Sequence, residues 1–221
     1  MSKTLDLRPF PLFLPGPLDR PAAQAWLDGQ PEAIRRVTYI DESGSLMQKP
    51  VIDAGAFVDP SALLIGGMIV SPGCYIGPKA VIRLDENDVP EPLIIGRESN
   101  VQDFALIHSH TTSIGKRVIV AHQAVVHGAT VEDEAALYIQ AVADGGTTIG
   151  RGSFLDQGSY VGKSIRLAPR RYVAPGVKVL TQGQADELPP VPDTIERIRL
   201  HVLELNALHV ERHLACAPDG G

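Results

Sequence analysis

Residues 58–82 read VDPSALLIGGMIVSPGCYIGPKAVI, and an aliphatic residue returns at every sixth position of this stretch. The recurring residues are Val58, Leu64, Val70, Ile76 and Ile82. A short repeat of this kind is typical of a parallel β-helix, in which each repeat supplies one short strand and one turn. Three repeats close one triangular coil, so residues about eighteen apart should stack at the strand spacing of roughly 4.8 Å.

The same repeat continues far along the chain, with one extra residue before Ile114 and one fewer before Val131. Its later members are Ile95, Val101, Ile107, Ile114, Val120, Val126, Val131, Leu137, Ala143, Ile149, Leu155 and Val161. We therefore expect a mainly β fold whose coil occupies residues 51–180, after an N-terminal extension over 1–50. So long a repeat in register argues against the alternative, a sandwich of alternating strands.

The C-terminal part, residues 181–221, is predicted to contain a linker and then an amphipathic α-helix. Asp193 is the expected N-cap, with Glu196 three residues later completing a capping box. Helical spacing places five residues on one apolar stripe: Ile195, Ile198, Val202, Leu205 and His209. We expect this helix to pack along the coil, either of its own subunit or of a neighbouring one.

The composition limits the classes of protein. A chain of 221 residues with 44% hydrophobic content is long enough for one domain with a substantial core. A net charge of −6 argues against a nucleic-acid partner. No apolar run approaches the ~20 residues of a membrane span. Prolines interrupt the start of the chain where a signal peptide needs an apolar core, so we expect a cytoplasmic protein.

Three histidines, His108, His122 and His127, lie within the repeat. His108 follows the inward residue Ile107 and His127 follows the inward residue Val126, so both occupy the same slot, one coil apart. Their side chains should stack on one face, close enough to reach one metal ion. Three imidazoles with an open fourth position are typical of a catalytic metal site. The alternative is that these are ordinary surface histidines.

His122 stands two places after Val120, so its side chain should point from another part of the triangle. A symmetric homotrimer would resolve this, because His122 of one subunit then faces the His108/His127 pair of the next. The sequence thus predicts metal sites between subunits. Zinc is the expected metal, and Fe²⁺ or Co²⁺ would also suit such ligands.

Four motifs carry a resemblance to a known family: RLDEN at 83–87, SNVQD at 99–103, IH at 107–108 and AHQAVVHG at 121–128. Together they resemble the γ-class carbonic anhydrases and the related domain of carboxysome scaffold proteins, over about residues 51–190. Membership of this hexapeptide-repeat group implies that the coil is left-handed, against the usual right-handed crossover.

The resemblance also implies roles for single residues. His108, His122 and His127 match the metal ligands, and Arg83 and Asp103 match an ion pair across the trimer interface. Asp85 matches the acid of the family's RxD motif. The remaining matches are two amides that line the active site, Asn100 and Gln102, and a glutamate implicated in proton transfer, Glu86.

The implied function is reversible hydration of carbon dioxide to bicarbonate by a metal-bound hydroxide. The family prototype carries an acidic loop after the first histidine, whereas here only SHTTSIGKRVIVA, residues 109–121, separates the first two ligands. His110 is a possible substitute proton shuttle, and Asn206 is the nearest polar candidate on the C-terminal helix. The alternatives are a non-catalytic trimeric scaffold that retains the metal site and, less favoured, a hexapeptide-repeat acyltransferase.

Overall fold

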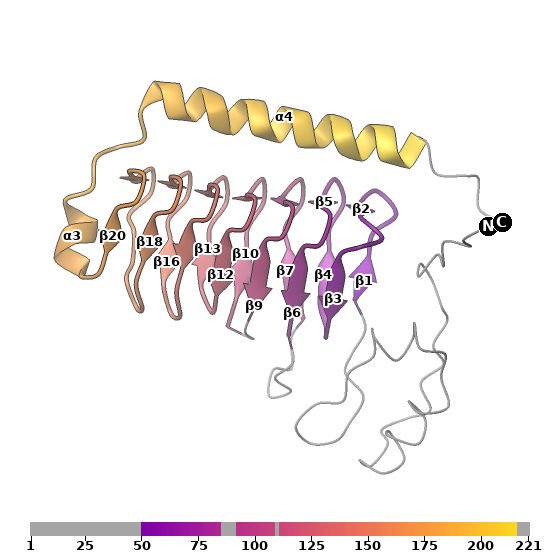
Figure 1. The fold of residues 1–221 in the computed structure, drawn as a ribbon, viewed down its shortest axis with the longest axis horizontal. Coiled ribbons are helices and arrows are strands. Elements are labelled where there is room, and N and C mark those ends of the chain that lie inside the picture. Colours follow the sequence, from indigo (N-terminus) through magenta and orange to yellow (C-terminus); the bar gives the residue numbers. More distant parts are fainter. Residues whose placement is uncertain (1–49, 85–91, 109–110, 216–221) are drawn as a thin grey trace, which may run out of the picture.

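The computed structural model describes residues 50–84, 92–108 and 111–215. These residues form a coil of short strands with one long helix lying along it (Figure 1). The strands belong to three sheets, and each strand pairs in parallel with the strand one coil before or after it. The predicted parallel β-helix is therefore confirmed.

Each side of the triangle is one sheet. Sheet 1 contains β1 (Val51–Ile52), β4 (Met68–Val70), β7 (Leu93–Ile95), β10 (Ser113–Ile114), β13 (Thr130–Val131) and β16 (Thr148–Ile149). Sheet 2 contains β2 (Phe57–Val58), β5 (Tyr75–Ile76), β8 (Asn100–Val101), β11 (Ile119–Val120), β14 (Ala136–Leu137), β17 (Phe154–Leu155) and β19 (Tyr172–Val173). Sheet 3 contains β3 (Leu63–Ile65), β6 (Val81–Arg83), β9 (Leu106–His108), β12 (Val125–His127), β15 (Val142–Ala143), β18 (Tyr160–Val161) and β20 (Lys178–Val179).

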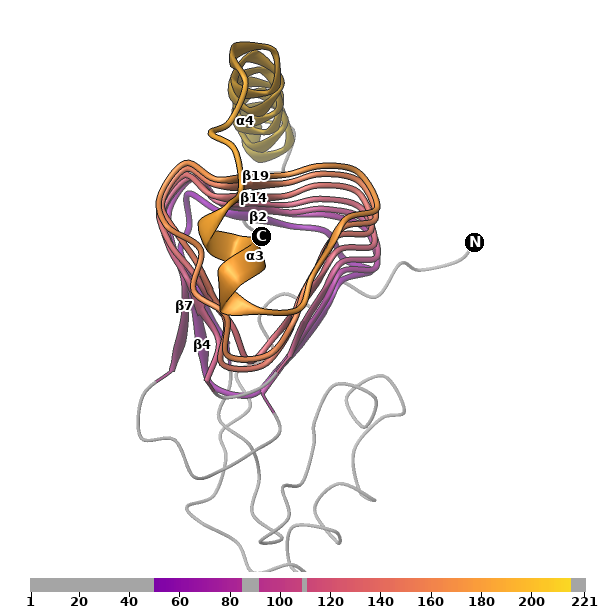
Figure 2. The ribbon, with the colours of Figure 1, turned by 90° about the vertical axis from the view of Figure 1, so that its left-hand side faces the viewer.

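The coil is left-handed, as expected. Figure 2 views it from its C-terminal end, with β4 and β7 of sheet 1 on the left and sheet 2 at the top. The chain passes from sheet 1 to sheet 2 and then to sheet 3, so it turns clockwise as it advances toward the viewer. That is the sense of a left-handed helix.

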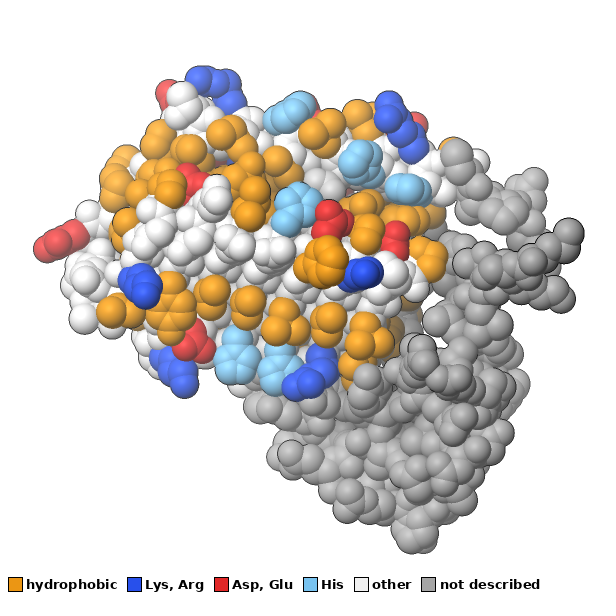
Figure 3. Space-filling model, viewed as in Figure 1, with side chains coloured by type: hydrophobic (Ala, Val, Ile, Leu, Met, Phe, Trp, Pro, Cys, Tyr) orange, Lys and Arg blue, Asp and Glu red, His pale blue; other side chains and the backbone are white. Residues whose placement is uncertain are grey.

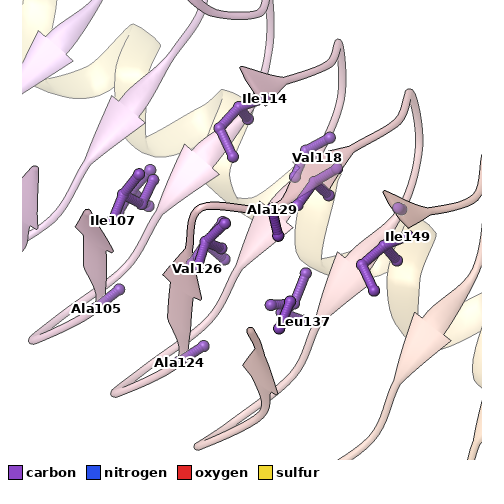
Figure 4. Packing of buried hydrophobic residues seen from close by; sticks show 14 of the residues in the cluster. Ala105, Ile107, Ile114, Val118, Ala124, Val126, Ala129, Leu137 and Ile149 are labelled. Carbon is purple, nitrogen blue, oxygen red and sulfur yellow. The ribbon is translucent and has the colours of Figure 1, made fainter. Parts of the chain in front are cut away.

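The repeat residues fill the inside of the coil. Ile82, Ile107 and Val126 belong to successive coils, pair in register and are completely buried. Figure 4 shows Ile107 and Val126 pointing into the core, with Ala105 and Ala124 at the preceding turns. Burying each such aliphatic side chain contributes roughly 1.5–3 kcal/mol, so the stacked columns hold the coil together.

One coil is longer than the others. Leu63 pairs with Val81, eighteen positions on, but Val81 pairs with Leu106, twenty-five positions on. The additional length includes residues 85–91, which lie outside the described residues. The strand register on either side of this segment is continuous, so Arg83 still stands opposite His108.

The structure adds one short helix at the C-terminus and shows that the predicted helix cap is wrong. The linker contains a helix, α3 (Gln182–Asp186), whose N-cap Thr181 forms a capping box with Gln184. The long helix α4 (Asp193–Ala215) already includes Asp193. The carbonyl of the residue before it, at position 192, accepts from the backbone N–H groups of residues 195 and 196, so Asp193 is not the cap.

Helix α4 packs along sheet 2 of its own chain (Figure 2). The buried residues on its inner face are Arg199, Leu203, Asn206 and Val210. Of the predicted apolar stripe, Ile195 and Val202 contact the coil, whereas Ile198 and Leu205 remain 40% and 41% exposed. The buried face is therefore offset from the predicted stripe, and two polar side chains, Arg199 and Asn206, take inward positions.

Aromatic contacts fix the far end of α4. The rings of Phe57 in β2 and His213 stack with centroids 4.1 Å apart, and those of Tyr75 and His209 lie 5.8 Å apart.

Within the described residues, no helix is both long and apolar enough to cross a membrane. The expected N-terminal extension over residues 1–50 falls almost wholly outside them.

Candidate metal centre

His108 and His127 lie side by side on the outer face of sheet 3. They end the neighbouring strands β9 and β12 and pair directly in the parallel register. Their ring centroids are 5.4 Å apart and the ring planes differ by 15°. Because side chains alternate along a strand, the buried Ile107 and Val126 turn both histidines outward. The predicted stacking is confirmed, while their role as metal ligands stays a prediction.

The pair belongs to a longer column of polar side chains, here called the polar ladder: Arg83, His108, His127 and Asp144, each one coil after the last. Arg83 Nη2 lies 3.1 Å from His108 Nε2. A guanidinium group only donates, so His108 Nε2 accepts in this contact and carries no proton. His127 Nδ1 lies 3.2 Å from Asp144 Oδ1 at the other end.

Asp144 is held by two further donors. The backbone N–H of Gly145 donates to Oδ1 at 2.7 Å, and the hydroxyl of Tyr160 donates to Oδ2 at 2.8 Å. The Gly145 N–H is the main reason that the pKa of Asp144 lies below its usual range, with Tyr160 and His127 acting in the same direction. Asp144 is therefore ionised at neutral pH and only accepts hydrogen bonds.

His122 lies at the turn between β11 and β12, away from the stacked pair. Its Nδ1 is 3.0 Å from Oδ2 of Asp103, which occupies the equivalent turn one coil earlier. The side chain of His122 is 49% exposed. Within the described part of one chain, no three His, Cys, Asp or Glu side chains gather closely enough to hold a metal ion.

Asn100 lies in β8 of sheet 2, the side that α4 covers, and Gln102 begins the turn from β8 to β9, next to Asp103. Asn100 pairs with Tyr75 and Ile119 of the adjacent strands. The ring of Tyr75 lies against His209 of α4, and Ile119 belongs to a buried hydrophobic cluster that includes Leu203 of α4. Gln102 Nε2 donates to Asn100 Oδ1 at 2.8 Å. Asn100 Nδ2 is buried without a hydrogen-bond partner in the described structure. Asn206 of α4, the helix candidate, donates to the carbonyl of residue 202 in its own helix.

The other predicted residues are divided between two groups. Arg83 and Asp103, expected to pair across a trimer interface, contact His108 and His122 respectively within one chain. Asp85, Glu86 and His110 lie outside the described residues. Within one chain, then, the structure brings together two of the three expected ligands.

The donor set fits a zinc ion. Neutral imidazole nitrogens bind zinc at about 2.0–2.1 Å, and a ring whose other nitrogen is held by a carboxylate is the common arrangement in such sites. His122 and His127 both have Nδ1 against an aspartate, which leaves Nε2 as the atom for a metal. At His108 the unprotonated Nε2 already faces a cationic group, Arg83.

Two residues around the histidine pair were missed in the sequence: Asp144 of the ladder, and Tyr160 beside it. Asp144 follows Ala143 in the slot that the histidines occupy after Ile107 and Val126, so extending the slot by one coil finds it. Tyr160 pairs with Val142, outside the ladder, and the sequence gives no sign that its hydroxyl turns toward Asp144. The repeat thus predicts the column, and the side-chain torsions decide the contacts.

Comparison with solved structures identifies the class of the fold. A hexapeptide transferase family protein from Anaplasma phagocytophilum superposes with a TM-score of 0.57 at 19% identity, covering 78% of this chain and 97% of that protein. At this identity the likeness concerns the fold alone. The chain is a left-handed β-helix protein of the hexapeptide-repeat class.

Comparison with characterised sequences identifies the family within this fold class. No family model matches the chain. The carbonic anhydrase of Methanosarcina thermophila is 31% identical over 167 residues, which are 65% of this chain and 66% of that protein. Gamma carbonic anhydrase 1, mitochondrial, of Arabidopsis thaliana is 34% identical over 127 residues, covering 53% of this chain and 45% of the relative. The chain belongs to the γ-carbonic-anhydrase-like family of left-handed β-helix proteins.

A second kind of relative also matches the chain. The carboxysome assembly protein CcmM of Synechococcus elongatus is 29% identical over 136 residues, covering 55% of this chain but 24% of that protein. Across these three relatives the chain spans between 24% and 66% of their length. Family membership therefore leaves the activity of this chain to be argued from its own residues.

Proposed function

We propose that the protein is a homotrimeric carbonic anhydrase that hydrates carbon dioxide reversibly to bicarbonate and a proton. The observation that carries the proposal is the stacked His108/His127 pair, whose third expected partner, His122, lies on another part of the same chain. A divalent metal ion would be held by the pair from one chain and by His122 of the next. Zinc is the proposed metal, and Fe²⁺ or Co²⁺ would fit the same imidazoles.

The face around the pair supports association of chains. Beside the histidines, the outward positions of sheet 3 form a row of half-buried apolar side chains: Leu63, Val81, Leu106, Val125, Val142 and Tyr160. Figure 3 shows this row of hydrophobic side chains next to two neighbouring histidines. A continuous apolar row of this kind beside an incomplete polar site suits an interface between identical subunits.

When bound to three imidazoles, zinc supplies a hydroxide nucleophile at neutral pH. The chain's own residues would transfer the proton, orient the reacting molecules and hold the subunits together. Glu86 would accept the proton released in the hydration, as a carboxylate near the reacting atoms does in general base catalysis. Gln102 and Asn100 would orient the reacting molecules through their amides. Arg83 and Asp103 would hold the two subunits in register, and His110 would pass the proton outward.

A second function is favoured by one specific finding. The match to CcmM, a carboxysome assembly protein, fits a trimeric scaffold that retains the metal site without turnover. The acyltransferase alternative receives no comparable support, because the likeness to the transferase-family structure concerns the fold alone.

One experiment separates these functions. The full chain would be purified with zinc, its mass and zinc content measured, and its carbon dioxide hydration followed by stopped flow with a pH indicator. The proposal expects a trimer with about one zinc per chain and hydration that His108→Ala abolishes. A zinc-loaded trimer that hydrates no faster than buffer would favour the scaffold, and a zinc-free protein would contradict both.

A further inference from the structure

Two tyrosine–aspartate pairs repeat the same local geometry at different places in the coil. Tyr160 donates to Asp144 at 2.8 Å, and Tyr172 donates to Asp156 at 2.6 Å. In each pair, the other carboxylate oxygen accepts a backbone N–H from the next residue at 2.7 Å. Both aspartates directly follow an inward repeat residue. Of the two aspartates, Asp144 alone also contacts a histidine within the described residues.

That contact has a fixed direction. The Asp144 carboxylate only accepts, so the 3.2 Å approach of His127 Nδ1 requires His127 to donate its proton from Nδ1. A neutral imidazole carries one proton, so Nε2 then carries the lone pair. The two ring nitrogens would otherwise exchange this proton, and only the form with an unprotonated Nε2 presents a ligand atom at the outer end of the ring.

We propose that Asp144 and Tyr160 are positioning residues for His127: together they hold its ring in the tautomer and orientation in which Nε2 binds the metal. The inference rests on the proposed function, which makes His127 a metal ligand. Tyr160 acts through Asp144, not on the metal. Its hydroxyl anchors Oδ2 while the Gly145 N–H anchors Oδ1, so the carboxylate is kept from rotating away from the ring.

The burial of the group supports this role. The side chain of Asp144 is 18% exposed, compared with 48% for His127, so the carboxylate is largely shielded from water that would compete for the imidazole proton. Outer hydrogen-bond partners of metal-ligating histidines typically change metal affinity by about 10–100-fold when removed. We expect Asp144→Asn to fall within this range, and Tyr160→Phe, one bond further from the ring, to lie near its lower end.

The test measures tautomer and metal affinity separately. Metal-free protein labelled with ¹⁵N-histidine is examined by NMR at about pH 8.5, above the ordinary histidine pKa of about 6.5. The His127 signal is assigned by its loss in His127→Gln. Zinc affinity is measured by chelator competition on the full chain, for wild type, Asp144→Asn, Tyr160→Phe and Tyr172→Phe. Tyr172→Phe is the matched control, since it removes the equivalent hydrogen bond from the pair that has no histidine.

The expected result is an Nδ1–H tautomer for His127 in the wild type, mixed tautomers in Asp144→Asn, and zinc affinity lowered by about 10-fold or more in that variant but unchanged in Tyr172→Phe. A wild-type His127 protonated at Nε2 would overturn the proposal, as would an Asp144→Asn protein with wild-type zinc affinity. If Tyr160→Phe and Tyr172→Phe lower the zinc affinity equally, Tyr160 has no positioning role. If neither the wild type nor any variant binds zinc, the proposed function fails. The NMR measurement of the His127 tautomer then still shows whether Asp144 holds the ring with its proton on Nδ1.

Discussion

Arg83→Ala is expected to dissociate the proposed trimer before it disturbs the coil. Arg83 ends β6 and is exposed in the single chain, where its Nη2 lies 3.1 Å from His108 Nε2. An exposed polar contact contributes about 0–1 kcal/mol to the stability of the chain, so the fold should survive. Across a buried interface, removing the partner of Asp103 leaves an unpaired charge that costs on the order of 3–5 kcal/mol. That cost lowers the association constant at each interface by at least roughly 100-fold.

The assay is a dilution series followed by light scattering, with zinc content measured at each concentration. Arg151→Ala is the matched control, because it removes an exposed arginine that lies 3.8 Å from Glu134 within the same chain. The double variant Arg83→Ala/Asp103→Ala should associate at least as well as Arg83→Ala alone, since no carboxylate is then left unpaired. An Arg83→Ala protein that stays trimeric and zinc-loaded to the same dilution as Arg151→Ala would refute the pairing.

Three further predictions concern proton transfer, backbone packing and thiol chemistry. Glu86→Gln should keep the bound zinc and the trimer but lower the rate of hydration by roughly 10²-fold, and imidazole buffer should restore part of that rate. If isotope exchange between carbon dioxide and bicarbonate falls equally and buffer gives no rescue, Glu86 is not the proton shuttle. Gly96→Ala should lower the free energy of unfolding by about 1–3 kcal/mol in thermal unfolding, because the added Cβ would lie 2.2 Å from the carbonyl oxygen of Gly115. Gly183→Ala is the control: its added Cβ would meet no atom within 4 Å, so the variant should be neutral or stabilising. Cys74 in a Cys216→Ser background should resist a thiol reagent at pH 8, because burial raises its pKa to about 11 and only the thiolate reacts; rapid labelling of folded protein would contradict this.

The periodic parts of the fold could be predicted from the sequence because each position in the repeat has one geometric role. Every repeat residue from Val70 to Val161 is buried, and the shared slot of His108 and His127 correctly predicts that they stack. The backbone determines these features, and the six-residue period determines the backbone. The same reasoning, carried one coil further, reaches Asp144.

The parts that the sequence could not predict depend on choices between nearly equal options. Helix α4 buries Arg199 and Asn206 instead of Ile198 and Leu205, because packing against sheet 2 selects the face, and the pattern of hydrophobic residues alone does not. The Arg83 contact with His108 likewise depends on side-chain torsions, which a repeat does not encode. The proposed contacts between chains are a third case, since the described residues of one chain bring together only two of the three proposed ligands.

The central claim is that each metal site takes its histidines from two chains, and mixing two inactive variants tests it directly. His108→Ala and His122→Ala are each expected to lose zinc as homotrimers, because every site then lacks one of three ligands. Co-expressed in equal amounts, they should form mixed trimers in which an intact pair from one chain meets an intact His122 from the other. Random assortment restores about a quarter of the sites, so zinc content and hydration should return to about that fraction of wild type. Mixed trimers that regain neither zinc nor hydration would contradict the shared site.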